Sequence, residues 1–179
     1  MTAPLRPLSV TIAMFSTAIA LAGCSLFQKD DPRACPRVSI LNDAARAVVY
    51  RDGPGRDLID VVHEGQIGEV GWSCKYSKTD VTVLAKIAFL AQRGPASSQP
   101  EARLPFFVAV TDSGREILAK QVFQTVVAFP EGRSQAGVFE EIEEIIPLPD
   151  QTSGPEYEII VGFQLTEEQL RHNRKRRRF

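Results

Sequence analysis

The chain has 179 residues, of which 44% are hydrophobic and 24% are charged, and its formal net charge at pH 7 is −1. This length suits a single domain that can bury a proper hydrophobic core. Beyond the N-terminal segment, no stretch is long and apolar enough to span a membrane as a helix.

The N-terminal segment carries the clearest pattern in the sequence. An apolar run from Leu8 to Leu21 follows Arg6 and contains no acidic residue. The run is shorter than the about 20 apolar residues of a bilayer-spanning helix, so it indicates a secretion signal. A short membrane anchor that is never cleaved is the alternative. The four residues that end at Cys24, with the sequence Leu-Ala-Gly-Cys, resemble the lipobox of bacterial lipoprotein precursors.

The lipobox resemblance implies a location for the protein. Residues 1–23 are expected to be a cleaved signal peptide, and Cys24 is expected to carry the lipid. Ser25 follows Cys24, whereas an Asp there often signals inner-membrane retention in this family, so we expect the periplasmic face of the outer membrane. Residues 24–36 are polar, with two prolines, and form the expected tether between lipid and fold. Nucleic acid is not an expected partner in that compartment.

Two cysteines remain if Cys24 is lipidated, and the periplasm is oxidising. We therefore predict a disulfide bond between Cys35 and Cys74. A redox or metal-binding pair is the weaker alternative, because the two cysteines are far apart in sequence and the chain has only two histidines.

Residues 37–170 have the pattern of a β-rich domain, in which short β-branched and aromatic runs alternate with turn residues. Alternate residues from Val81 to Phe89 are apolar, which indicates a strand with one buried face. The absence of intervening helical patterns favours a mainly β fold, an antiparallel β-sandwich of about 7–9 strands with a short C-terminal helix. The polar segment from Arg93 to Arg103 is expected to be a loop within a hairpin. The predicted strands are Val38 to Leu41, Ala47 to Arg51, Leu58 to His63, Gln66 to Tyr76, Asp80 to Ala91, Leu104 to Thr111, Glu116 to Phe129, Val138 to Pro147 and Glu156 to Gln164.

Three segments have a helical pattern of varying strength. The apolar residues between Phe139 and Ile146 fit a helical period about as well as a strand, and Asn42 to Val48 could form a helical turn capped by Asn or Asp. The convincing helix follows Thr166, because Thr166 and Gln169 have the spacing of a capping box.

The sequence contains no motif that indicates catalysis, and we expect neither an enzyme nor a cofactor or metal site. His63 and Glu64 are adjacent in a predicted strand, which places neighbouring side chains on opposite faces, so a structural histidine is favoured over an acid–base pair. The cluster Glu140, Glu141, Glu143 and Glu144 does not follow a calcium-loop spacing, and a solvated face is favoured over a cation site.

Residues 171–179 form a basic tail that contains six of the 21 basic residues and no acidic one. At low salt these charges could attract an acidic envelope protein or an anionic lipid. The alternative is a soluble terminus without a dedicated partner, or attraction to the rest of the same chain, since residues 24–170 contain 22 acidic and only 14 basic residues. The candidate binding residues are Arg171, Arg174, Lys175, Arg176, Arg177 and Arg178.

Three function classes remain, in decreasing order of preference. The first is a non-catalytic lipoprotein that binds or assembles other envelope components, the second a carrier of a lipid or other small apolar ligand, and the third an enzyme. Beyond the lipobox, the body resembles small uncharacterised lipoproteins of Gram-negative bacteria, a resemblance that implies no activity. It rests on Cys35-Pro36-Arg37-Val38, Cys74-Lys75-Tyr76, Pro105-Phe106-Phe107-Val108 and Gly162-Phe163-Gln164-Leu165-Thr166.

Overall fold

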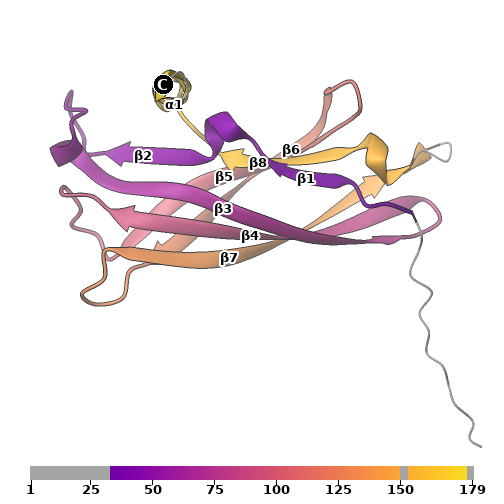
Figure 1. Ribbon diagram of the computed structural model, residues 1–179, viewed down its shortest axis with the longest axis horizontal. Helices are drawn as coiled ribbons and strands as arrows, with labels where there is room; N and C mark the ends of the chain where they lie inside the picture. Colours follow the sequence, from indigo (N-terminus) through magenta and orange to yellow (C-terminus); the bar gives the residue numbers. More distant parts are fainter. Residues whose placement is uncertain (1–32, 150–152, 177–179) are drawn as a thin grey trace, which may run out of the picture. The chain divides into compact units, whose positions relative to one another are not determined.

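The computed structural model describes residues 33–149 and 153–176, and the described part is mainly β (Figure 1). The expected signal peptide, Cys24, Arg177 and Arg178 lie outside the described residues. In chain order the elements are β1 (Arg37–Ile40), η1 (Asn42–Ala44), β2 (Arg46–Tyr50), η2 (Leu58–Asp60), β3 (Val61–Tyr76), β4 (Asp80–Arg93), β5 (Glu101–Thr111), β6 (Ile117–Ala128), β7 (Gln135–Pro147), η4 (Gly154–Glu156), β8 (Glu158–Phe163) and α1 (Glu167–Arg176).

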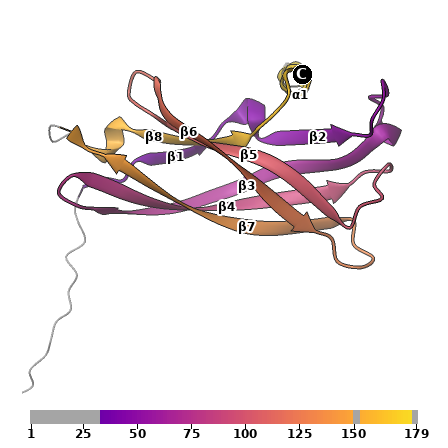
Figure 2. The same ribbon diagram turned by 180° about the vertical axis from the view of Figure 1, so that it is seen from behind.

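The eight strands of the described residues form two four-stranded sheets, with the orders β1-β8-β5-β6 and β2-β3-β4-β7. All neighbouring strands are antiparallel except β1 and β8, which are parallel. The chain changes sheet between β1 and β2, between β4 and β5, between β6 and β7, and between β7 and β8. Seen from behind, the two sheets lie one over the other (Figure 2), so the predicted sandwich is confirmed.

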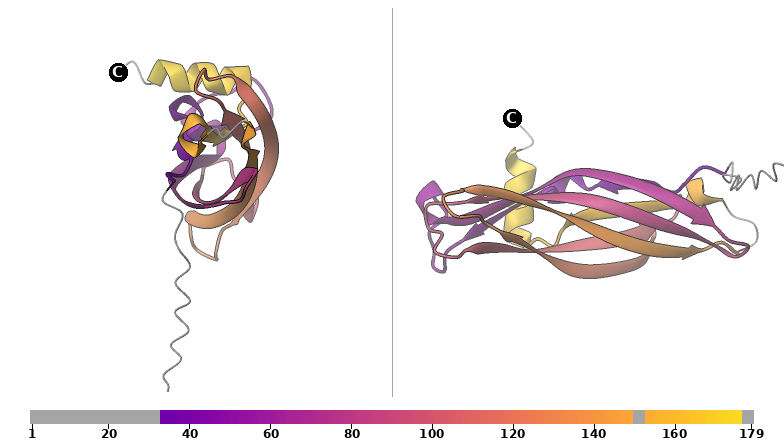
Figure 3. Two further views of the ribbon diagram at one scale, coloured as in Figure 1. Left: turned by 90° about the vertical axis from the view of Figure 1, so that its right-hand side faces the viewer. Right: turned by 90° about the horizontal axis from the view of Figure 1, so that it is seen from below.

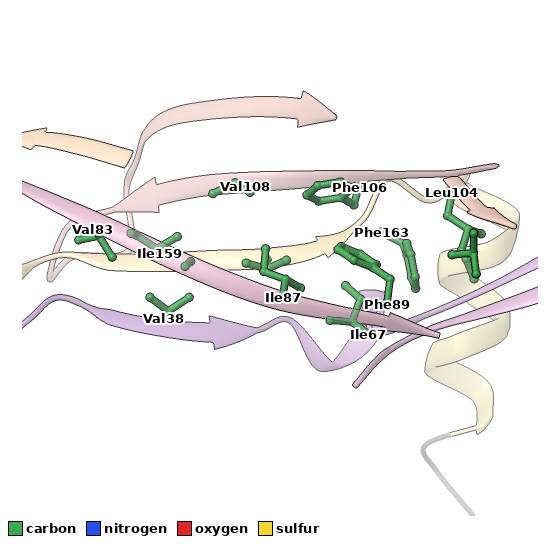
Figure 4. Packing of buried hydrophobic residues seen from close by; sticks show 14 of the residues in the cluster. Val38, Ile67, Val83, Ile87, Phe89, Leu104, Phe106, Val108, Ile159 and Phe163 are labelled. Atoms are coloured by element: carbon green, nitrogen blue, oxygen red, sulfur yellow. The ribbon is translucent and has the colours of Figure 1, made fainter. Parts of the chain in front are cut away.

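The core lies between the sheets. It consists of the inward-pointing residues of the strands, which alternate along each strand with outward-pointing ones. Phe89 of β4 meets Phe106 of β5 and Phe163 of β8, with ring centroids 4.6 and 5.8 Å away (Figure 4). All three rings are almost completely buried. The predicted alternation from Val81 to Phe89 is confirmed, since every second residue of that run is buried. Burial of such side chains stabilises a fold by about 1.5 to 3 kcal/mol each.

The prediction of two strands around His63 was wrong. Residues 61–76 form the single long strand β3, and Leu58 and Ile59 lie in the short 3₁₀ helix η2 before it. A capping box begins η2: Asp57 and Asp60 each accept a hydrogen bond from the other's backbone. As a result, Leu58 and Ile59 are 79% and 67% exposed instead of lining the core.

The expected hairpin around residues 93–103 is also wrong. Its two strands, β4 and β5, belong to different sheets, so the segment between them is a crossover. The error arises because alternation identifies a strand but not its partner. The segment from Phe139 to Ile146, whose pattern was ambiguous, is part of β7 and contains no helix. The possible helical turn at Asn42 to Val48 is the 3₁₀ helix η1, which covers only Asn42–Ala44 because β2 begins at Arg46. The expected cap by Asn or Asp is wrong, since Leu41 is the N-cap residue and no side chain caps the helix.

The C-terminal helix α1 begins as predicted. The backbone N–H of Thr166 donates to Gln169 Oε1 (2.9 Å), and the N–H of Gln169 donates to Thr166 Oγ1 (3.3 Å). These reciprocal bonds are the capping box. The helix continues through Arg176, so six of the nine residues of the basic tail are helical. Figure 3 shows that α1 runs across the strands and not along them.

Candidate interaction sites

The start of the fold is held to one end of β3. The Sγ atoms of Cys35 and Cys74 lie 2.03 Å apart, which is the distance of the predicted disulfide bond. Two residues further along β3, the Tyr76 hydroxyl donates to the carbonyl oxygen of Ala34 (2.6 Å) and accepts from the N–H of Gly154 (3.0 Å). The guanidinium of Arg33 lies 3.8 Å from the centre of the Tyr76 ring. Residues 33–35 are therefore fixed to this end of β3.

The histidine considered in the sequence lies in the core. His63 is only 8% exposed, and among the described residues neither ring nitrogen has a hydrogen-bond partner. Burial lowers the pKa of His63 below its ordinary value. Glu64 follows on the opposite face of β3. The two side chains therefore cannot act together on one substrate.

The acidic cluster divides between the two faces of β7. Glu141 and Glu143 are exposed, as expected for a solvated face, and Glu141 forms an ion pair with Lys86 (3.5 Å). The expectation is wrong for the other two. Glu144 is buried, and its burial raises its pKa, whereas Glu140 is half-buried and accepts a hydrogen bond from Thr125 of β6 (2.6 Å). The carboxylate of Glu140 therefore links β7 to β6, an edge strand of the other sheet.

A groove of about 450 Å³ lies between α1 and the segment from β2 to residue 56. We call this hollow the α1 groove. Arg56 spans it: its guanidinium donates to Glu168 (2.9 Å) and to the carbonyl oxygens of Gly53 and Gly55 (2.8 and 2.7 Å). Contact with Glu168 raises the pKa of Arg56, and the same contact lowers the pKa of Glu168. The basic residues that line the α1 groove are Arg51, Arg56, Arg171, His172 and Lys175.

The predicted basic residues are divided by the structure. Arg171 and Lys175 line the α1 groove, whereas Arg174 points elsewhere and pairs with Asp43 (3.1 Å). Arg171 also forms an ion pair with Glu167 one turn earlier (3.4 Å). Arg176 is the last residue of α1. Part of the basic helix is thus attracted to acidic groups of its own chain, which was one of the two alternatives for the tail.

A second candidate surface was not found from the sequence. On the outer face of the β2-β3-β4-β7 sheet, four large apolar side chains are 45% to 61% exposed. Leu90 of β4 lies over the backbone of Gly137, since a Cβ built there would be 3.0 Å from Leu90 Cδ2. Phe139 is the diagonal neighbour of Leu90 across the β4–β7 pair, and such neighbours contact each other. We call these four residues the outer patch: Leu84, Leu90, Phe139 and Ile145.

The outer patch adjoins a shallow groove of about 330 Å³ on the same sheet. Leu90 lines this groove together with polar residues of all four strands, among them Arg46, Glu64 and Gln92. The sequence did contain a signal for the patch. Leu84 and Leu90 belong to the set of alternate residues of β4 that points outward. Polar residues are expected at such positions, so each leucine is an exception to the pattern.

The described residues contain no group of three or more His, Cys, Asp or Glu side chains that could hold a metal ion. Within the same part of the chain, no helix has the length and apolar character that a bilayer crossing requires. Comparisons with protein-family models, with curated proteins and with solved structures find no match to this chain.

Proposed function

We propose that this chain is a lipid-anchored envelope protein that binds other envelope components and does not catalyse a reaction. Lipid attachment at Cys24 and a position on the periplasmic face of the outer membrane follow from the lipobox resemblance. The expected partner is a protein with an apolar contact surface. No cofactor is part of the proposal.

The outer patch is the observation that carries this proposal. Its residues form two pairs of diagonal neighbours, Leu90 with Phe139 and Leu84 with Ile145, on either side of the ion pair of Lys86 and Glu141. Groups of exposed apolar side chains on a folded domain mark contact sites for other molecules. The four residues of the patch lie on two paired strands, whose backbone is fixed by the sheet, so the surface is presented without an ordering cost. The charged pair of Lys86 and Glu141 lies within the patch and would orient a partner.

The packing of the interior supports a function in binding partners at the surface, in preference to carrying a small ligand between the sheets. Buried side chains of both sheets pack together in one cluster, in which Phe89 contacts Phe106 and Phe163 (Figure 4). The two grooves described above lie outside this core, and charged or polar residues line much of each one. The α1 groove supplies a secondary contact for an anionic group, through Arg171 and Lys175.

Site-specific photocrosslinking in intact envelopes tests the proposal. A photoreactive amino acid in place of Phe139 or Leu90 is expected to capture a discrete protein that mass spectrometry identifies. The control position is Ser113, which is exposed in the turn between β5 and β6 of the other sheet. Equal crosslinking at patch and control positions would contradict the proposal.

The anchor has a separate test. The variant Cys24→Ala is expected to move the protein from the membrane fraction to the aqueous phase of a detergent extraction, because the lipid provides the attachment. Replacing Ser25 by Ala is the control and should leave the fractionation unchanged. If Cys24→Ala protein still fractionates with membranes, the proposed lipid anchor is wrong.

A further inference from the structure

Strand β2 forms one edge of its sheet, and half of its backbone groups face away from the neighbouring strand. Just before β2, the carbonyl oxygen of Ala45 accepts a hydrogen bond from the N–H of Ile67 in β3. Because backbone groups alternate in direction along a strand, the N–H and C=O groups of Ala47 and Val49 also point toward β3. The N–H and C=O groups of Arg46 and Val48 consequently point outward. An edge of this kind is a template for pairing with another strand.

Helix α1 occupies the outward carbonyl groups of this edge. The side-chain amide of Gln169 donates to the Val48 carbonyl oxygen (2.7 Å). One helical turn later, the amide of Asn173 donates to the carbonyl oxygens of Arg46 (2.8 Å) and Asp43 (2.9 Å). Two side chains of one helix face thus take the acceptors that a neighbouring strand would use.

The attachment of α1 is almost entirely polar. The helix has ten residues, with the sequence EEQLRHNRKR, and Leu170 is its single apolar residue. Besides the two amides, the ion pairs Arg174–Asp43 and Arg56–Glu168 connect it to the sandwich. Isolated helices shorter than about 12 to 15 residues are marginal in water, and exposed ion pairs stabilise little. Detachment of α1 is therefore much easier than unfolding of the sandwich.

We infer that the β2 edge is a self-pairing surface for a second copy of this chain, and that α1 is the guard that keeps it closed. A two-fold antiparallel pairing centred on Ala47 places Arg46 of one copy opposite Val48 of the other. In a hydrogen-bonded antiparallel pair, the two residues exchange both N–H···O bonds. The acceptors in this arrangement are the same Arg46 and Val48 carbonyl groups that Asn173 and Gln169 occupy.

The side chains of β2 favour a second copy as the occupant. The strand RAVVY carries one charged residue, Arg46, and the two-fold register sets it opposite valine instead of a second arginine. Like charges directly opposite each other would destabilise the pair. The interface is isologous, so it closes at a dimer and does not propagate into a fibre. Because β2 has five residues, we expect a weak dimer whose population depends on protein concentration.

The test compares oligomeric state in full-length protein held in detergent solution. The double variant Gln169→Ala/Asn173→Ala removes both guarding amides and should dimerise as its concentration rises, whereas the unmodified protein stays monomeric at the same concentrations. Sedimentation velocity measures the fraction of dimer. The matched control is His172→Ala/Lys175→Ala, on the same helix, whose side chains donate no hydrogen bond to β2 in the described structure, and it should behave as the unmodified protein.

A proline separates pairing at β2 from any other association. In the double variant, Val48→Pro removes an outward N–H but leaves the β2–β3 ladder intact, because edge strands tolerate proline at outward positions. It should return the protein to the monomer. The single variant Asn173→Ala provides a milder release, and thermal unfolding verifies that each variant is folded. The inference is wrong if the folded variants remain monomeric, or if the dimer survives Val48→Pro.

Discussion

The sandwich and helix α1 are attached to the same chain by different kinds of contact. Inside the sandwich, the rings of Phe89, Phe106 and Phe163 meet without solvent, and long ladders of backbone hydrogen bonds surround them. Helix α1 contributes no large apolar side chain to that core and is held by amide and ionic contacts at the surface. The difference predicts two levels of stability within one domain, since apolar burial dominates folding and exposed polar contacts contribute little.

The largest expected effect comes from the core of the sandwich. Phe89→Ala removes a ring with no solvent exposure and should lower the free energy of unfolding by about 3 to 5 kcal/mol. The substitution loses the apolar contacts of the ring and leaves a cavity in its place. Chemical denaturation measures this value. Phe139→Ala, across the β4–β7 pair on the outer patch, is the matched control. An equal loss for both phenylalanines would refute the assignment of inner and outer faces.

Next in size is the disulfide bond between Cys35 and Cys74. Cys74→Ser should lower the free energy of unfolding by about 2 to 4 kcal/mol under oxidising conditions, because the bridge restricts the unfolded chain. Melting with and without reductant checks the cause. The unmodified protein should lose stability when reduced, and the variant should not respond. Identical melting of unmodified protein in both conditions would argue against a bridge in solution.

A smaller effect, which depends on pH, concerns the carboxyl group inside the sandwich. Burial raises the pKa of Glu144 above its ordinary value of about 4.5, so the folded state holds its proton more tightly than the unfolded state does. The free energy of unfolding therefore falls as the pH rises through and above 4.5. Glu144→Gln should raise stability at neutral pH and lose this advantage in acid.

Glu143→Gln is the control for this pH dependence, because Glu143 is the exposed neighbour on the same strand. It should change stability little at either pH. Thermal unfolding over a pH series measures both variants. A gain from Glu144→Gln that is the same in acid and at neutral pH would show that the carboxyl charge is not its cause.

The smallest effect on global stability is expected at α1. Glu168→Gln weakens the contact with Arg56, and both groups are exposed, so the midpoint of thermal unfolding should not change measurably. Local stability should change, however, with faster amide hydrogen exchange in α1 and unchanged exchange in β4. If α1 and β4 exchange together in the unmodified protein, the helix and the sandwich unfold as one unit and the proposed difference does not exist.

Sequence patterns predicted the features that depend on neighbouring residues. The alternation through Val81 and Phe89 identified β4, and the spacing of Thr166 and Gln169 identified the beginning of α1. Both patterns are local, because burial repeats with the strand period and a capping box closes within one helical turn.

Features that depend on distant partners could not be predicted in this way. The pairing of β1 with β8 and the separation of β4 from β5 depend on the arrangement of whole sheets. The inward position of Glu144 contradicts the usual preference for solvent, and a charge pattern alone does not reveal it. The contacts of Asn173 with the β2 edge join residues that lie 127 and 130 positions apart in the chain. The sequence shows that Asn173 has an amide that can donate hydrogen bonds, but it does not show which carbonyl groups accept them.

The junction of Cys35 with Cys74 has a mechanical consequence. If the chain is pulled from its N-terminal side, the tension reaches the disulfide bond before it reaches β1. The covalent bond passes the load directly to β3, which is held by twelve paired positions to β4. The short four-residue strand β1 lies outside that load path, so the force does not act directly on its parallel pairing with β8.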